Sequence, residues 1–249
     1  MNEEKHWNAI GKSYDGEIFD VFKSNKGNKL QRYFKRHQNK KHRAIDFGCG
    51  TGKAFEYMAP FFKEVLAIDI SQNLLDIAKT SGYKNISYKR GDLTKSDLKL
   101  ALADFAFCCN VAILSNTKGN FAIIRNIEKS LHKNGTALLV IPSLESVLYA
   151  TSRMIEWYGK EGTSVDEIPI NDLDYYRSNR DFANGIIYID NVPTKHYLEP
   201  EIRAMLSNTK LQLTALDKLE YSWKTEFESP PNWIKEPFPW DWLVECKKK

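Results

Sequence analysis

The chain is predicted to fold as an α/β protein with a doubly wound, mostly parallel, seven-stranded sheet. Five short apolar runs between residues 44 and 141 alternate with segments of helical periodicity, the pattern of a parallel sheet covered by helices on both faces. The first run ends in a loop with glycine at every second position, so this loop can turn tightly and let a ligand approach the backbone. Two further strand-like runs follow near the end of the chain.

The first predicted strand, Ala44–Phe47, leads into the loop Gly48-Cys49-Gly50-Thr51-Gly52. Two common glycine-rich motifs do not fit this loop. A phosphate-binding P-loop needs four residues between its first glycine and a Gly-Lys pair, whereas Gly48 leaves only three before Gly52. A dinucleotide fingerprint needs a third glycine at the position that Lys53 occupies. The loop therefore belongs to another class of ligand site.

The second and third predicted strands each lead to an acid. Residues 65–69 end in Asp69, close to the spacing from the glycine loop at which an acid binds the ribose hydroxyls of a nucleotide. Ser71 is predicted to cap a helix over residues 72–80. The third strand begins at Ile86 and is followed by Gly91-Asp92-Leu93. These acids are expected to meet at the carboxyl edge of the sheet.

The remaining elements complete the sheet. Residues 103–110 form a continuous apolar run, typical of a strand that is buried on both faces. A helix is predicted over residues 120–132, a turn at Lys133-Asn134-Gly135 and a fifth strand over residues 136–141. The tail is expected to contain a helix at 200–207 and strands at 211–219 and 240–246.

The series Asp46, Gly48, Gly50 and Gly52, followed by Asp69 and Asp92, resembles class I S-adenosylmethionine (SAM)-dependent methyltransferases of the small-molecule type. The resemblance covers residues 42–142 specifically and 197–249 loosely. It implies that the last strand pair contains one antiparallel strand and that SAM is the cofactor, with no metal site. The cofactor-binding residues that it implies are Asp46, Gly48, Cys49, Gly50, Gly52, Asp69, Ile70, Asp92, Leu93, Asn110, Val111 and Tyr14.

Three regions are expected. Residues 1–41 would form a helical cap over the cofactor site, residues 42–143 and 197–249 the Rossmann-like core, and residues 144–196 a substrate-binding lid inserted after the fifth strand. Residues 144–199 carry ten acids against five bases and many aromatic side chains. Such a lid suits an amine or another cation through cation–π contacts. It equally suits an aromatic acceptor, and packing of these aromatics onto the sheet is the structural alternative.

Methyl transfer from a sulfonium depends mainly on alignment of the reactants, and a general base helps when the acceptor must lose a proton. His196 is the predicted base because it stands where the lid returns to the sheet. Tyr14, in an N-terminal Tyr-Asp pair, is expected to cover the methionine moiety or the acceptor, and Trp7 to close the site. Aromatic core packing is the alternative for both rings.

Nine lysines and arginines, with no acid, lie between Val21 and Ile45. This basic run is either a nucleic-acid footprint or the solvated face of a helix whose Leu30, Tyr33 and Phe34 pack inward. An Asn/Asp-Pro-Pro-Tyr motif, found in many enzymes that methylate base amines, is missing after the fourth strand.

We therefore expect a cytoplasmic monomer or homodimer that methylates nitrogen or oxygen of a small molecule, without a membrane partner. No apolar stretch approaches the length of a membrane span. Nucleic acid is the less favoured partner but stays open. The alternatives are an RNA or protein acceptor and a non-catalytic SAM-binding protein.

Overall fold

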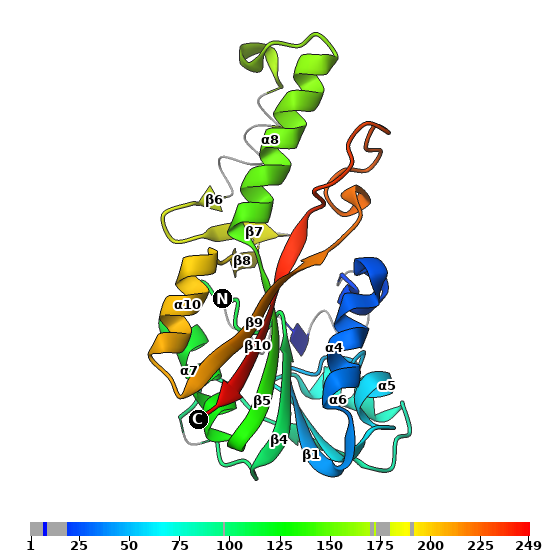
Figure 1. Ribbon diagram of the computed structural model, residues 1–249, viewed down its shortest axis with the longest axis vertical. Coiled ribbons are helices and arrows are strands. Elements are labelled where there is room, and N and C mark those ends of the chain that lie inside the picture. The colour runs from blue at the N-terminus through cyan, green and yellow to red at the C-terminus, as the bar shows by residue number, and fades with distance from the viewer. Residues whose placement is uncertain (1–6, 9–18, 97, 170–171, 173–179, 190–191) are drawn as a thin grey trace.

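The computed structural model describes residues 7–8, 19–96, 98–169, 172, 180–189 and 192–249. A seven-stranded sheet lies at its centre, in the order β3-β2-β1-β4-β5-β10-β9 (Figure 1). The strands are β1 Asn39–Phe47, β2 Phe62–Asp69, β3 Ile86–Arg90, β4 Ala103–Cys109, β5 Leu131–Pro142, β9 Leu211–Glu220 and β10 Trp240–Lys248. The first five pair in parallel, and β10 is antiparallel to both β5 and β9. The predicted sheet with one antiparallel strand is confirmed.

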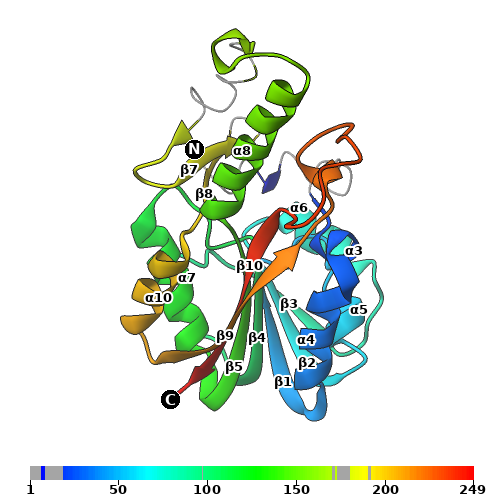
Figure 2. The same ribbon diagram turned by 45° about the horizontal axis from the view of Figure 1, so that its top comes forward.

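Helices cover both faces of this sheet (Figure 2). On one side lie α3 (Val21–Ser24), the short η1 (Lys26–Asn28), α4 (Lys29–His37), α5 (Phe55–Met58) and α6 (Gln72–Lys79). On the other lie α7 (Thr117–Lys129) and α10 (Glu199–Ser207). Each face has its own apolar core, with Phe34 and Phe107 in the first and Ile124 and Ile202 in the second. The sheet is thus the middle layer of three.

The basic run forms α4 and the start of β1. Leu30, Tyr33 and Phe34 are buried, as predicted for a helix that packs its apolar face inward. Lys29 donates to a backbone carbonyl of β9, and the Arg36 guanidinium lies 4.3 Å from the Tyr33 ring centroid. Much of this positive charge is therefore in contact with the fold itself.

Several element boundaries differ from the predictions. Helix α7 begins at Thr117 because the Asn116 side chain accepts a hydrogen bond from Lys118 N and caps it there. Strand β5 begins at Leu131, before the predicted turn. At the position of that turn the pairing of β5 with β4 shifts register, and Asn134 has a φ of 67°. Strand β3, by contrast, ends at Arg90, directly before Gly91-Asp92 as predicted.

The segment between β5 and α10 rises from the carboxyl edge of the sheet. It contains α8 (Leu144–Lys160), η2 (Val165–Glu167) and a small antiparallel sheet of β6 (Arg180–Asp181), β7 (Ile186–Ile189) and β8 (Val192–Lys195). Helix α8 projects away from the core (Figure 1). Its Ala150 and Met154 pack against Trp223, Phe227 and Ile234 of the β9–β10 connection, which includes η3 (Trp223–Thr225). Within the described residues, none of the helices has the length and apolarity needed to cross a bilayer.

Candidate functional site

A cavity of about 500 Å³ opens at the carboxyl ends of β1, β2 and β4. In open α/β sheets this edge, where helices leave alternate strands toward opposite faces, is where ligands bind. The cavity is bounded on one side by the glycine loop and the acids that follow β2 and β3. Its other walls come from α3, the β4–α7 loop and the β7–β8 hairpin.

The glycine loop is fixed between its two neighbouring strands. The backbone N–H groups of Gly48 and Cys49 both donate to the Ile68 carbonyl, at 2.8 and 2.9 Å. Gly48 has a φ of 72°, and a Cβ placed on it would lie 2.2 Å from Val111 Cγ2. Any side chain there would therefore be strained and would displace the β4–α7 loop.

Asp69 joins this loop to β2. Its Oδ2 accepts from Gly50 N and its Oδ1 from Ser71 N, both at 2.9 Å. Burial raises the pKa of the Asp69 carboxyl even though these backbone donors lower it. The carboxylate is thus a structural acceptor as well as a candidate for ribose hydroxyls.

Two buried oxygens in the cavity lining stand out. Asp46 Oδ2 and Asn110 Oδ1 have no hydrogen-bond partner among the described residues. Burial first, and the charge on Asp69 second, raise the pKa of Asp46 to about 8. Asn110 follows β4 with a φ of 54°. A buried acceptor without a donor costs about 1–3 kcal/mol, so these atoms fit a ligand that carries N–H donors and positive charge, such as an α-ammonium group.

The acid after β3 also lines the cavity. Asp92 Oδ1 accepts from Thr94 N at 2.9 Å and from Thr94 Oγ1 at 2.6 Å, and Oδ2 lies 3.8 Å from Lys95 Nζ. Leu93 is buried beside it. This end of the cavity presents a fixed carboxylate next to an apolar surface, which suits a heterocycle with an amino group.

Most of the predicted cofactor residues come together here. Those that line the cavity are Asp46, Gly48, Cys49, Asp69, Ile70, Asp92, Leu93, Asn110 and Val111. Gly50 and Gly52 hold the loop in place through backbone hydrogen bonds. Gly50 N donates to Asp69 Oδ2, and Gly52 N donates to Cys49 O at 2.9 Å. Tyr14 lies outside the described residues. Trp7 lines the cavity, and the neighbouring Asn8 accepts a hydrogen bond from the Ser71 hydroxyl at 2.7 Å.

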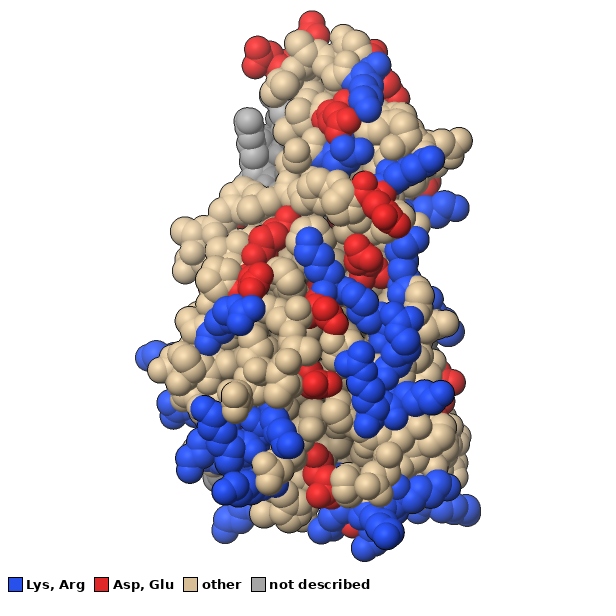
Figure 3. Space-filling view, in the orientation of Figure 1, with Lys and Arg blue, Asp and Glu red and all other residues tan. Residues whose placement is uncertain are grey.

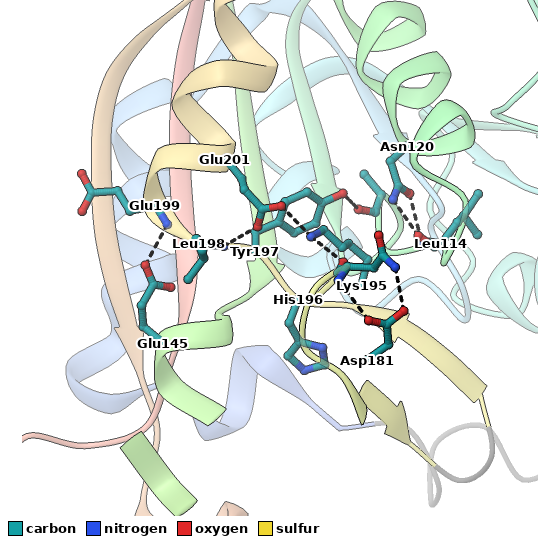
Figure 4. A network of polar contacts seen from close by, with 12 residues as sticks. Leu114, Asn120, Glu145, Asp181, Lys195, His196, Tyr197, Leu198, Glu199 and Glu201 are labelled. Atoms are coloured by element: carbon teal, nitrogen blue, oxygen red, sulfur yellow. Dashed lines mark hydrogen bonds and ion pairs between the residues drawn. The ribbon is translucent and has the colours of Figure 1, made fainter. Parts of the chain in front are cut away.

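His196 lies next to the cavity wall and is not among the described residues that line it (Figure 4). It is 5% exposed, its backbone N–H donates to Gly185 O at 2.7 Å, and its Nδ1 lies 3.1 Å from Thr194 O. Its neighbours Pro193 and Thr194 do line the cavity. A proton-accepting role for His196 stays a prediction.

Three wall segments contain lining residues that were not singled out from the sequence, although two of these segments lie within the predicted cap, residues 1–41, and the predicted lid, residues 144–196. Ile113 and Leu114 come shortly after Asn110 and Val111. Their position after the fourth strand could therefore have indicated that they line the site. The α3 and hairpin residues carry no motif and reach the cavity only through tertiary packing. These additional lining residues are Phe19, Val21, Phe22, Ile113, Leu114, Ile189, Val192, Pro193 and Thr194.

The fold is shared with solved methyltransferases. The structure described as the DhpI–SAM–HEP complex superposes with a TM-score of 0.63 at 12% identity, covering 97% of this chain and 94% of that one. Residues 45–139 match the family described as methyltransferase domain. Over residues 45–139 this chain is therefore similar to the methyltransferase domain family, and its fold is the Rossmann-like methyltransferase fold. The match runs from β1 to the middle of β5 and so contains the glycine loop and the acids of the cavity.

Two curated relatives are similar to about a third of this chain. A Saccharomyces cerevisiae protein described as probable S-adenosylmethionine-dependent methyltransferase CRG1 is 34% identical over 77 residues, 31% of this chain. Ribosomal RNA small subunit methyltransferase A of Mycoplasma capricolum is 31% identical over 81 residues, 32% of this chain. The alignments take in 23% and 30% of these relatives, less than a third of either protein.

Proposed function

We propose that the protein transfers the methyl group of SAM to nitrogen or oxygen of a small molecule. The observation that carries the proposal is the pair of buried, unpartnered oxygens of Asp46 and Asn110 in the lining of a cavity at the carboxyl edge of the sheet. An α-ammonium group supplies the donors and the charge that both oxygens lack. SAM carries such a group at its methionine end.

Each part of the cavity then has a binding role. Asp46 and Asn110 would hold the ammonium, and Asp69 the ribose hydroxyls, because a carboxylate accepts two hydrogen bonds from a vicinal diol. Asp92 would accept from the adenine amino group, with Leu93 against the ring. When bound, SAM supplies a methyl group activated by the sulfonium. The chain's own task is to align an acceptor with it and to exclude water.

The walls opposite these acids are the proposed acceptor site. We propose that residues 1–41 and 144–196 act as the cap and the substrate-binding lid of the domain. Tyr14 would cover the methionine end, and His196 would accept the acceptor's proton. With Nδ1 donating to Thr194 O, the lone pair of His196 would lie on Nε2. Both residues are proposed roles for mutagenesis.

An RNA acceptor is the second candidate, favoured by the similarity to a ribosomal RNA methyltransferase and by the basic side chains over α4 and at the lower end of the molecule (Figure 3). Strong salt dependence of RNA binding, lost on charge reversal of Lys35 and Lys40, would favour it. Salt-independent or absent RNA binding would leave the small-molecule proposal standing. A non-catalytic SAM-binding protein is the third candidate.

Turnover separates an enzyme from a binding protein. The purified protein is incubated with SAM labelled on its methyl group and with sets of phenols, amines and RNA. We expect label in a small-molecule product and formation of S-adenosylhomocysteine, both abolished in Asp46→Asn. Cofactor binding without product from any acceptor would favour the non-catalytic alternative.

A further inference from the structure

The acceptor side of the cavity is one wall built from two segments far apart in the sequence. Leu114 of the β4–α7 loop forms an antiparallel bridge with Thr194 of β8. The Lys195 backbone N–H donates to Ile113 O at 2.7 Å. Ile113, Leu114 and Thr194 all line the cavity. The hairpin is therefore joined edge to edge with the methyltransferase core.

Buried polar contacts hold both halves of this wall (Figure 4). The Lys195 ammonium, on a residue that is 6% exposed, lies 2.8 Å from Glu201 Oε1 and 2.8 Å from Asn184 O. Across the bridge, the Asn120 amide accepts from Leu114 N at 2.8 Å and donates to Leu114 O at 2.7 Å. These contacts fix the wall's shape and keep the Lys195 charge out of the cavity lining.

The wall itself is apolar. Its main side chains are Ile113, Leu114, Val192 and Pro193, and the Thr194 hydroxyl donates back to Val192 O at 3.1 Å. Phe19 and Phe22 of the α3 region face the same cavity. A charged acceptor group that packs against these side chains would lose its water without a charged partner in the wall, and burial of an unpaired charge is far costlier than burial of a neutral polar group.

Three described acids of the inserted segment bind partners outside the cavity. Glu145 accepts from Glu199 N at 2.8 Å, Glu156 lies 2.9 Å from Lys160 Nζ, and Asp181 accepts from Asn184 Nδ2 at 2.6 Å. Among the described residues, no acid between 144 and 199 lines the cavity. The described acids of this segment therefore give no reason to expect a cationic acceptor.

We propose that the acceptor is an uncharged aromatic molecule, such as a phenol, that packs against the Ile113–Leu114 and Val192–Thr194 wall. This inference rests on the proposed function, since it concerns the acceptor side of the same cavity. It selects one of the two substrate classes that the sequence left open. Shape and exclusion of charge, rather than ion pairing, determine which acceptor enters.

Three probes of similar size and different charge test the inference: p-cresol, benzylamine and benzoate. Each is titrated by calorimetry into the protein saturated with S-adenosylhomocysteine, whose own binding is measured first. We expect p-cresol to bind at least about tenfold more tightly than either ion, a difference of about 1.4 kcal/mol. Equal or tighter binding of benzylamine, or no binding of p-cresol, would overturn the inference.

A charge placed in the wall sharpens the test. We expect Val192→Asp to weaken p-cresol and to strengthen benzylamine, each at least about tenfold, while S-adenosylhomocysteine binding stays unchanged. The control is Val165→Asp in η2, where the side chain is 56% exposed and outside the cavity lining. A misfolded variant would not gain affinity for a cation. If Val192→Asp leaves the relative affinities of the three probes unchanged, this wall is not part of the acceptor site. If S-adenosylhomocysteine does not bind the wild type, the proposed function is contradicted instead.

Discussion

The Gly50 backbone N–H donates to Asp69 Oδ2 at 2.9 Å, so the acid that ends β2 holds the glycine loop that ends β1. The other oxygen of the same carboxylate accepts from Ser71 N, and Ser71 Oγ caps α6 through Leu74 N at 3.2 Å. One side chain therefore connects the loop, β2 and the next helix. Its structural role is separate from any contact with ribose.

Asp69→Ala is expected to destabilise the ligand-free protein by about 2–4 kcal/mol, because two buried backbone donors lose their acceptor. Urea unfolding measures this loss. Asp76→Ala is the control, since the contacts of Asp76 with Gln72 and Lys79 are exposed and its loss should leave the urea midpoint close to that of the wild type. Equal stability of Asp69→Ala and the wild type would show that the loop does not depend on this carboxylate.

Gly48→Ala is expected to cost about 2–4 kcal/mol, the sum of left-handed strain and overpacking against Val111. Gly162→Ala is matched to it, because Gly162 has a φ of 88° but nothing within 4 Å of an added Cβ. The control should therefore show the strain alone, about 1–2 kcal/mol. Thermal unfolding of both variants, with S-adenosylhomocysteine titration, separates the two effects. Loss of cofactor affinity in both would argue against a specific role for the Gly48–Val111 approach.

The central sheet and the cofactor side could be predicted because local signals determine them. An apolar run that ends in Asp46 or Asp69 marks both a strand and its carboxyl edge, and topology brings those edges together. Asn134 illustrates the same point: in the predicted turn Lys133-Asn134-Gly135 it takes a left-handed φ of 67°, which asparagine tolerates better than most residues. Such features depend on a few consecutive residues.

The acceptor side could not be predicted in the same way. The Leu114–Thr194 bridge joins residues 80 positions apart, and neither lies in a motif. The acids of residues 144–199 suggested a cation site, but Glu145 binds the Glu199 backbone N–H 54 residues away, and Glu156 and Asp181 bind neighbours in their own segments. The burial of His196 beside the wall likewise follows from packing of the hairpin on the core.

Lys195→Met is expected to loosen the hairpin by removing a buried ammonium that binds Glu201 and Asn184. We expect a loss of about 1–3 kcal/mol and faster amide exchange over residues 186–195, with S-adenosylhomocysteine affinity unchanged. Lys79→Met removes an exposed ion pair with Asp76 and should cost less than about 0.5 kcal/mol. Hydrogen exchange at the hairpin as slow as in the wild type would contradict the anchoring role of Lys195.

Asp46 makes the stability of the ligand-free protein depend on pH. Its pKa of about 8 in the fold lies above the usual value of 3.8, so folding favours the protonated form. The stability from this proton is present below pH 3.8 and is lost as pH rises through 8. Asp46→Asn avoids that loss. The Tm of Asp46→Asn minus that of the wild type should therefore increase from pH 5 to pH 8. The increase should be at least about 2 °C for each kcal/mol of stability that the wild type loses over this range. A Tm difference independent of pH would show that Asp46 does not titrate in this range.

Calorimetric titration with S-adenosylhomocysteine at pH 7, in two buffers of different ionisation enthalpy and with NAD in parallel, tests the central claim most directly. We expect micromolar binding of S-adenosylhomocysteine, no binding of NAD, and release of a proton, because the ligand's ammonium favours the ionised form of Asp46. Asp46→Asn should bind more weakly and release no proton. Absence of S-adenosylhomocysteine binding to the wild type would contradict the assignment of this cavity to SAM.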